Sequence, residues 1–382
     1  MGRASIVILR DGFRLLAGCA AHLSKPKCLP RHGGLDSGTG IRLLERTNVA
    51  ASPGREMIPC RPAALPALLA LVALATPGVH ADPLLTRNQN PLVLPYGLPS
   101  PLPSRLPATD TGRATLDINW SNSADDDISD PHQFTIDAET QDVRLRLEYA
   151  FTGNWAGLIE LPWRHLSGGT LDGLIENWHD LFGLPNGARD RMPDDRLLIQ
   201  YQEGDEVKLQ VDDDASGIAD VPVALGYQLK ASDRSALAGW LSVDVPVGDS
   251  SELLGSDATD VALSLAGQTQ LAEHWQLFGQ VDAVWLGQGD ILAQYQESFA
   301  WAGLAGVSWN AWRSLDLTVQ VYANSRIFDV SIDGLSGDAV VLSYGGTWRT
   351  PGGWRFDFGM NEDVEVNASP DMTFYLAVQH GF

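Results

Sequence analysis

Cysteine is missing from most of this chain, because Cys19, Cys28 and Cys60 all precede residue 61. Residues 82–382 therefore offer no disulfide, no thiol nucleophile and no cysteine metal site. Positive charge is also scarce. Of the 26 Lys and Arg, 10 precede residue 82, and so do 4 of the 48 Asp and Glu, which leaves 16 bases against 44 acids and a formal charge of −28. Such an acidic chain excludes nucleic-acid binding through the phosphates.

Long apolar runs are missing as well. The one extended run, residues 63–75, contains Pro66 and is too short to cross a bilayer as a helix. Arg61 precedes the run and the small-residue site Val79-His80-Ala81 follows it. Residues 57–81 are therefore predicted to be a secretory signal peptide cut after Ala81, with a buried core helix as the alternative.

Residues 1–56 show no sustained periodicity, which favours translation from Met57; a genuine N-terminal extension is the alternative. Residues 82–113 follow the signal and are rich in proline and asparagine, as in "NQNPLVLPYGLPSPLPSRLP". Repeated prolines remove backbone donors and favour extended backbone. We predict that this segment is an ordered extended arm or a linker.

From residue 114 to the end, apolar residues alternate with polar or small ones, the period of a strand with two unlike faces. Twelve such stretches can be counted, the last being "MTFYLAVQHGF" at the C-terminus. A soluble sandwich scatters charge over its outer face, whereas here charge is nearly confined to one face of each stretch. The sequence predicts an all-β fold: a closed antiparallel transmembrane β-barrel of about 12 strands, with lipid outside and water inside.

The charged residues of the polar faces are predicted to face this lumen. They are Asp117, Arg144, Arg146, Glu148, Glu160, Arg164, Lys230, Asp244, Asp282, Asp316, Arg355 and Asp357. Acids and bases are mixed, so a pore lined by them would be mildly cation-preferring. "FTIDAE" (residues 134–139) either extends the second strand or forms a separate one.

Short and long connections alternate along the chain, as in a barrel with tight periplasmic turns and larger outer loops. The longest outer loop, residues 166–217, contains a stretch with helical spacing. Leu171, Leu174, Trp178 and Phe182 lie on its apolar stripe. We predict a short helix that packs at or in the barrel mouth and narrows it; a helix lying on the membrane surface is the alternative.

Aromatic residues gather near both ends of the predicted strands, which is typical of the two membrane interfaces. The predicted interface residues are Trp155, Trp163, Trp285, Trp309, Trp348, Trp354 and Phe382. The terminal phenylalanine on an outward-facing strand also resembles the C-terminal signal of proteins inserted by the outer-membrane assembly machinery. That resemblance implies the assembly machinery and outer-membrane lipid as partners.

Candidate catalytic and metal sites are weak. His179 and Asp180 are adjacent on a predicted helix, point about 100° apart and cannot form a simple dyad. His380 lies on an apolar face, and no serine or asparagine is placed to pair with it. The acidic runs at residues 125–130, 212–214 and 362–365 lack the glycine-punctuated spacing of a calcium loop and are read as solvated. No cofactor is expected.

The stretch "GGTLDGLIENWHDLFGLPNGARDRMPDDRLLIQY", with "NQNPLV" upstream, resembles a proteobacterial outer-membrane β-barrel family catalogued as a domain of unknown function. The resemblance covers nearly all of residues 82–382 and implies an outer-membrane barrel, but no activity and no functional residues. We expect a channel or uptake protein for a small solute in the outer membrane of a Gram-negative bacterium. A membrane-embedded envelope enzyme of lipid hydrolase type and a structural or adhesive barrel are the alternatives.

Overall fold

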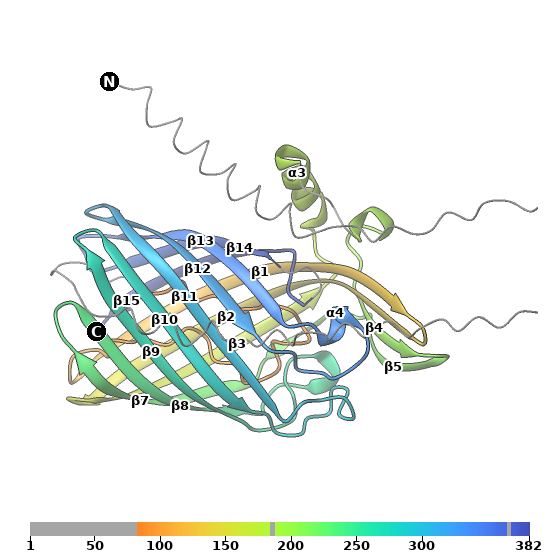
Figure 1. Cartoon of the computed structure of the whole chain (residues 1–382), viewed down its shortest axis with the longest axis horizontal. Coiled ribbons are helices and arrows are strands. Elements are labelled where there is room, and N and C mark those ends of the chain that lie inside the picture. Colours follow the sequence, from red (N-terminus) through yellow and green to blue (C-terminus); the bar gives the residue numbers. More distant parts are fainter. Residues whose placement is uncertain (1–81, 184–187, 365–367) are drawn as a thin grey trace, which may run out of the picture. The chain divides into compact units, whose positions relative to one another are not determined.

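Twelve antiparallel strands close into a ring (Figure 1). The computed structural model describes residues 82–183, 188–364 and 368–382. The strands of the ring, in chain order, are β1 (Thr111–Ser129), β2 (His132–Thr152), β3 (Trp155–Ser167), β7 (Val221–Ala231), β8 (Ser235–Val245), β9 (Asp260–Ala272), β10 (Trp275–Trp285), β11 (Phe299–Trp312), β12 (Leu315–Asn324), β13 (Ala339–Arg349), β14 (Arg355–Asp363) and β15 (Met372–Gly381). The predicted closed barrel of 12 strands is confirmed.

The last strand closes the ring on the first. β1 and β15 pair in antiparallel register from Arg113 opposite Gly381 to Asn122 opposite Met372. Phe382 continues the pairing, because its N–H donates to the Gly112 carbonyl at 2.9 Å and its own carbonyl accepts from the Gly112 N–H at 2.8 Å. A closed ring leaves no strand edge unpaired, so a strand can continue to the final residue of the chain.

Several short elements lie at the long-loop end of the ring. β1 and β2 extend beyond it as a long hairpin, and "FTIDAE" belongs to β2. β4 (Leu198–Glu203) pairs with this extension and with β5 (Glu206–Val211), while β6 (Ala215–Ile218) pairs with β3. Two short helices, α3 (Asp172–Phe182) and α4 (Asp333–Ser336), complete the described elements with two 3-10 turns, Arg189–Arg191 and Ser250–Glu252.

The predicted helix in the longest outer loop is thus confirmed as α3. Among the described residues, no helix is both long enough and apolar enough to span a bilayer.

The proline-rich segment before β1 enters the barrel (Figure 1, orange). Every residue from Pro83 to Ser104 except Gly97 is buried, and β1 begins at Thr111. The segment contacts the inner side of the ring on β2, β8, β10, β12 and β14. Residues 83–106 are called the plug below.

The remaining domain predictions concern the start of the chain. The predicted extension, residues 1–56, and the predicted signal peptide, residues 57–81, lie outside the described residues and stay predictions.

Candidate functional site

The ring has two chemically different faces. Large apolar side chains on its outer face are exposed on every strand; Leu263 is 54% and Leu376 is 58% exposed. Their sequence neighbours, such as Ser264 and Ala377, face inward and are buried. Side chains of a strand alternate between faces, so an apolar outer belt and a polar interior follow directly from the sequence pattern. This is the distribution of a barrel that meets hydrocarbon outside and water inside.

Most of the charged residues predicted to face the lumen are buried inside the ring. Arg144 binds Asp117 at 2.7 Å, Arg146 binds Glu160 at 2.5 Å, and Arg164 lies 3.5 Å from Asp142. The others lie in the same interior: Glu148 with Arg113, Asp316 with Arg349, Arg355 with Asp357, and Asp244 and Asp282 on β8 and β10. Each wall arginine named here has an acidic partner on its own or an adjacent strand.

Lys230 corrects the predicted set. A β-bulge between Gln228 and Lys230 adds a residue to β7, so Lys230 stands opposite Leu237, a residue of the outer face. Lys230 is exposed. A bulge inverts the alternation beyond it, and strict period-two counting therefore assigned this residue to the wrong side.

Wall glutamines bind the backbone of the plug. The Gln320 amide accepts from the Leu84 N–H at 3.0 Å and donates to the Leu84 carbonyl at 3.1 Å. Gln280 accepts from the Leu102 N–H at 2.6 Å, and Gln228 accepts from the Leu106 N–H at 2.8 Å. Few backbone groups of the plug are paired within the plug itself, so these amides supply hydrogen bonds that a neighbouring strand would otherwise make.

Arginines and one tryptophan complete the contacts with plug carbonyls. Arg144 donates to the Leu85 carbonyl at 2.6 Å and Arg146 donates to the Pro101 carbonyl at 2.8 Å. The Trp240 indole N–H donates to the Pro103 carbonyl at 2.9 Å. The wall therefore binds the backbone of the plug on both sides of the turn that the plug makes at residues 91–95.

The outer end of the plug is held by apolar packing instead. Leu92, Val93, Tyr96 and Leu98 join a buried cluster that includes residues from β2, β4 and the outer loops. The Tyr96 ring contacts Phe328 edge-on at 5.7 Å between centroids, and its hydroxyl donates to the Ile291 carbonyl at 3.2 Å. The long-loop end of the lumen is closed by this cluster.

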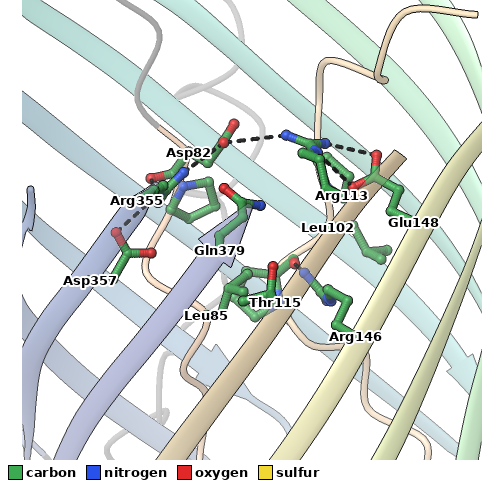
Figure 2. A pocket seen from close by; sticks show the side chains of 13 residues that line it. Asp82, Leu85, Leu102, Arg113, Thr115, Arg146, Glu148, Arg355, Asp357 and Gln379 are labelled. Atoms are coloured by element: carbon green, nitrogen blue, oxygen red, sulfur yellow. Dashed lines mark hydrogen bonds and ion pairs between the residues drawn. The ribbon is translucent and has the colours of Figure 1, made fainter. Parts of the chain in front are cut away.

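At the short-turn end both ends of the plug meet charged residues of the wall. Asp82 lies between two arginines (Figure 2); its carboxylate is 2.7 Å from Arg355 and 3.5 Å from Arg113. A cavity of about 20 Å³ lies here between the plug and the wall. That volume holds about one water molecule.

Helix α3 lies on the outer side of the wall, not in the mouth. Leu171 and Ile175 pack against Met372, with Trp120, Trp178, Met360 and Phe374 around them. Met372 alternates with the inward-facing Thr373, so it belongs to the outer face of β15. The prediction that Leu171, Leu174, Trp178 and Phe182 narrow the mouth is therefore corrected.

The physical reason is that the plug already fills the lumen, and the outer face offers the apolar surface that the helix stripe needs. Leu174 is exposed, and the side chain of Phe182 lies outside the described residues. A buried Arg189 binds Asp172 of α3 at 2.5 Å within the loop, and it attaches the loop to the wall through Asn122 of β1 at 2.5 Å and through Asp371, next to β15, at 2.6 Å. Burial raises the pKa of Asp371, and the Arg189 guanidinium opposes that shift.

The predicted interface aromatics are exposed on the outer face: Trp155, Trp163, Trp285, Trp309, Trp348, Trp354 and Phe382. His380 lies beside one of them, with its ring centroid 4.5 Å from that of Trp354. Within the described residues, no group of three or more His, Cys, Asp or Glu has a metal-binding arrangement.

The plug was the feature that sequence reasoning missed. One signal could have found it: residues 83–106 carry two charges, Arg87 and Arg105, and seven leucines. A linker in water has no reason to be so apolar. The length and prolines indicated extended backbone, but only the low charge indicated burial.

The model of one protein family, described as a protein of unknown function (DUF3187), matches residues 62–382. No curated protein sequence matches the chain. Among solved structures, an outer-membrane channel from Pseudomonas putida F1 is similar, with 15% identity and a TM-score of 0.48 over 73% of this chain and 97% of that chain. The NanC porin is similar with 9% identity and a TM-score of 0.40, over 69% and 98% of the two chains. The KdgM porin is similar with 7% identity and a TM-score of 0.38, over 70% and 99%.

Proposed function

We propose that this protein is an outer-membrane channel for a small solute, closed at rest by the plug. The chain belongs to this family of proteins of unknown function, as its sequence resemblance predicted. The proposal therefore rests on the geometry of the chain itself. Its closed barrel, even strand count and short turns at one end support the outer membrane as its location. Export through a signal peptide at residues 57–81 and insertion by the assembly machinery through Phe382 belong to the same proposal.

One observation carries the proposal: the plug enters and leaves the lumen at the same end. Asp82, directly before the plug, binds Arg355 at the first residue of β14, and Leu106, the last residue of the plug, binds Gln228 beside the turn that joins β7 to β8. A segment that is looped into the lumen can leave as a loop, without unthreading. Its bonds to the wall are hydrogen bonds and packing contacts, so its release breaks no strand pairing.

The chemistry of the wall supports passage of a polar solute once the plug has moved. The inner side chains include many amides, hydroxyls and charged groups, which remain compatible with water when the plug leaves. A wall that only had to support a permanent core would be filled more stably by apolar side chains, because each buried polar group has to recover its lost hydration.

The test is a reversible lock between plug and wall. The Thr86 hydroxyl accepts from the Asn361 amide at 2.6 Å, so the side chains at these two positions lie in contact. Thr86→Cys/Asn361→Cys, introduced into the full chain and bridged during refolding by a short bis-methanethiosulfonate reagent, which forms a disulfide with each cysteine and releases two methanesulfinate ions, is expected to abolish single-channel openings in planar bilayers. Added reductant is expected to restore them.

A matched control carries the same lock away from the plug. Gln200→Cys/Gln210→Cys joins two directly opposite residues of β4 and β5 and is expected to leave the openings unchanged. The proposal is overturned if the unlocked protein passes neither ions nor small sugars at any voltage. Openings that persist in the locked protein would also overturn it.

A further inference from the structure

The outer face of β14, β15 and β1 changes from apolar to polar where these strands approach the long-loop end. Directly paired residues form three successive rows across this face. The rows, in order toward the long-loop end, are Phe358, Leu376 and Ile118, then Met360, Phe374 and Trp120, and last Glu362, Met372 and Asn122. Of the three, only the third row contains a carboxylate or an amide.

Two aromatic residues bridge the second and third rows. The Trp120 indole N–H donates at 2.6 Å to Glu139 of β2, which belongs to the third row by its pairing. Tyr344 of β13 stands opposite Met360, and its hydroxyl donates to Glu362 at 2.6 Å. Tryptophan and tyrosine are enriched at membrane interfaces, because the ring is apolar and its polar atom needs a partner. The second and third rows therefore mark the level at which the apolar belt ends.

Helix α3 begins at this level. Glu139 accepts from the Thr170 N–H at 2.8 Å and from the Leu171 N–H at 2.9 Å, directly before the first residue of the helix. Leu171 and Ile175 then pack against Met372 of the third row, among the apolar residues of the second row. The helix is therefore attached to the outer wall at the boundary between the apolar belt and the polar rim.

The polar edge of α3 is turned toward the long-loop end. Asp172 binds Arg189 at 2.5 Å, and Arg189 binds Asn122 of the third row and Asp371, which directly precedes β15. Glu176, one helical turn after Asp172, lines the same small cavity as Arg189. These two acidic side chains of α3 therefore point away from the apolar belt.

The opposite edge of α3 is apolar and exposed. Leu174 is 52% exposed and Leu181 is 74% exposed. Successive helical residues are about 100° apart, so Leu181 points roughly 180° and Leu174 roughly 160° away from Asp172. Because Asp172 is turned toward the long-loop end, the two leucines are turned back toward the first row, where Leu376 is exposed on the wall. The leucines thus continue the apolar surface of the belt.

We propose that α3 is an interfacial helix and that Leu174 and Leu181 insert among the lipid acyl chains of the leaflet at the long-loop end. An amphipathic helix in this plane buries its apolar side at the boundary between headgroups and acyl chains. The occupant of the apolar edge is lipid, because this edge is continuous with the belt that the barrel presents to hydrocarbon. The assignment goes beyond the channel and does not depend on conductance through the lumen.

The first experiment is hydroxyl-radical footprinting of the full chain, incorporated at one copy per phosphatidylcholine nanodisc. Radicals formed in water oxidise the side chains that water reaches, and mass spectrometry measures the rate at each residue. Ile128, near the tip of the β1–β2 hairpin, is the matched control, because it is 71% exposed and lies beyond the third row. Leu181 is expected to be oxidised severalfold more slowly than Ile128, at a rate near that of Leu376.

Equal oxidation rates at Leu181 and Ile128 would overturn the proposal. A single copy per nanodisc also excludes a second copy of this chain as the cover of the apolar edge. Protection of Leu181 that is present in crowded vesicles and lost in single-copy nanodiscs would assign the edge to self-association, and would overturn the assignment to lipid.

The second experiment places a nitroxide on each side of the helix. Leu181→Cys and Asp180→Cys are introduced one at a time into the full chain carrying Cys19→Ser, Cys28→Ser and Cys60→Ser, and are spin-labelled in the same nanodiscs. Asp180 is exposed on the polar side of α3. The ratio of collisions with oxygen, which concentrates in lipid, to collisions with a water-soluble nickel chelate is expected to be severalfold higher at Leu181→Cys. Equal ratios at the two positions would overturn the proposal, whether or not the channel conducts.

Discussion

Gln320 in the middle of β12 holds Leu84 by both atoms of its amide, one accepting from the Leu84 N–H at 3.0 Å and the other donating to the Leu84 carbonyl at 3.1 Å. The pair joins residues 236 positions apart in the chain. A side-chain amide has the donor and acceptor of a peptide group, so it pairs with an extended residue as a neighbouring strand would. The plug is bound to the wall in the way that strands bind one another, but one residue at a time.

Removing this clamp tests how firmly the plug is held. Gln320→Ala removes two hydrogen bonds and is expected to favour plug release by about 1 to 3 kcal/mol. Trypsin cleavage after Arg87, followed by mass spectrometry of the folded protein, is expected to become faster because that bond is reached only outside the lumen. Gln200→Ala, a glutamine of the β4–β5 hairpin whose side chain binds Gln210 and Gln202, is the control. Unchanged protection of Arg87 in the Gln320 variant would show that the clamp does not hold the plug.

Gly97 is expected to tolerate no side chain. Its Cβ would meet the Cβ atoms of Asp260 and Asp244, which belong to paired strands and cannot retreat. Gly97→Ala is expected to unseat the plug and raise the frequency of channel openings, measured in planar bilayers. Gly173→Ala, where an added Cβ meets nothing within 4 Å, is expected to behave as the parent protein does. Equal opening frequencies in the two variants would contradict the close packing of the plug.

Arg189 is expected to hold α3 against the outer wall. Arg189→Met leaves Asp172 without its buried partner, and breaking such a pair costs about 3 to 5 kcal/mol. We expect faster proteolysis within residues 172–191, while the barrel keeps its far-ultraviolet circular dichroism. Arg191→Met changes a residue whose side chain is 63% exposed and is expected to have little effect. The Arg189 variant should also retain its channel openings in planar bilayers, because α3 lies outside the lumen. Loss of the openings would instead indicate that α3 controls the channel.

The strands and their two faces could be predicted because they depend on local pattern. Leu145 and Leu147 alternate with Arg144 and Arg146, and the pleat of a strand places the two sets on opposite sides whatever the rest of the chain does. The prediction failed at Lys230 because a β-bulge adds one residue to β7 and shifts the alternation of its two faces. The residue types around the bulge do not indicate that it is there.

The sequence also predicted the α3 helix but not the surface that it covers. An apolar stripe indicates that one side of a helix is buried. Leu171 and Ile175 could have been buried either in the barrel mouth or against the outer wall. The choice was decided by what else fills the lumen, and that depends on contacts between distant parts of the chain.

The amino-acid order alone determined a twelve-stranded barrel with an apolar outside and a charged inside, because strand period and hairpin length are local properties. Only the tertiary structure decided that the proline-rich segment fills that interior. The prolines and leucines of residues 83–106 indicate a segment with much extended backbone that avoids water. The wall residues that bind this segment, from Gln228 to Asn361, become neighbours only when the ring closes.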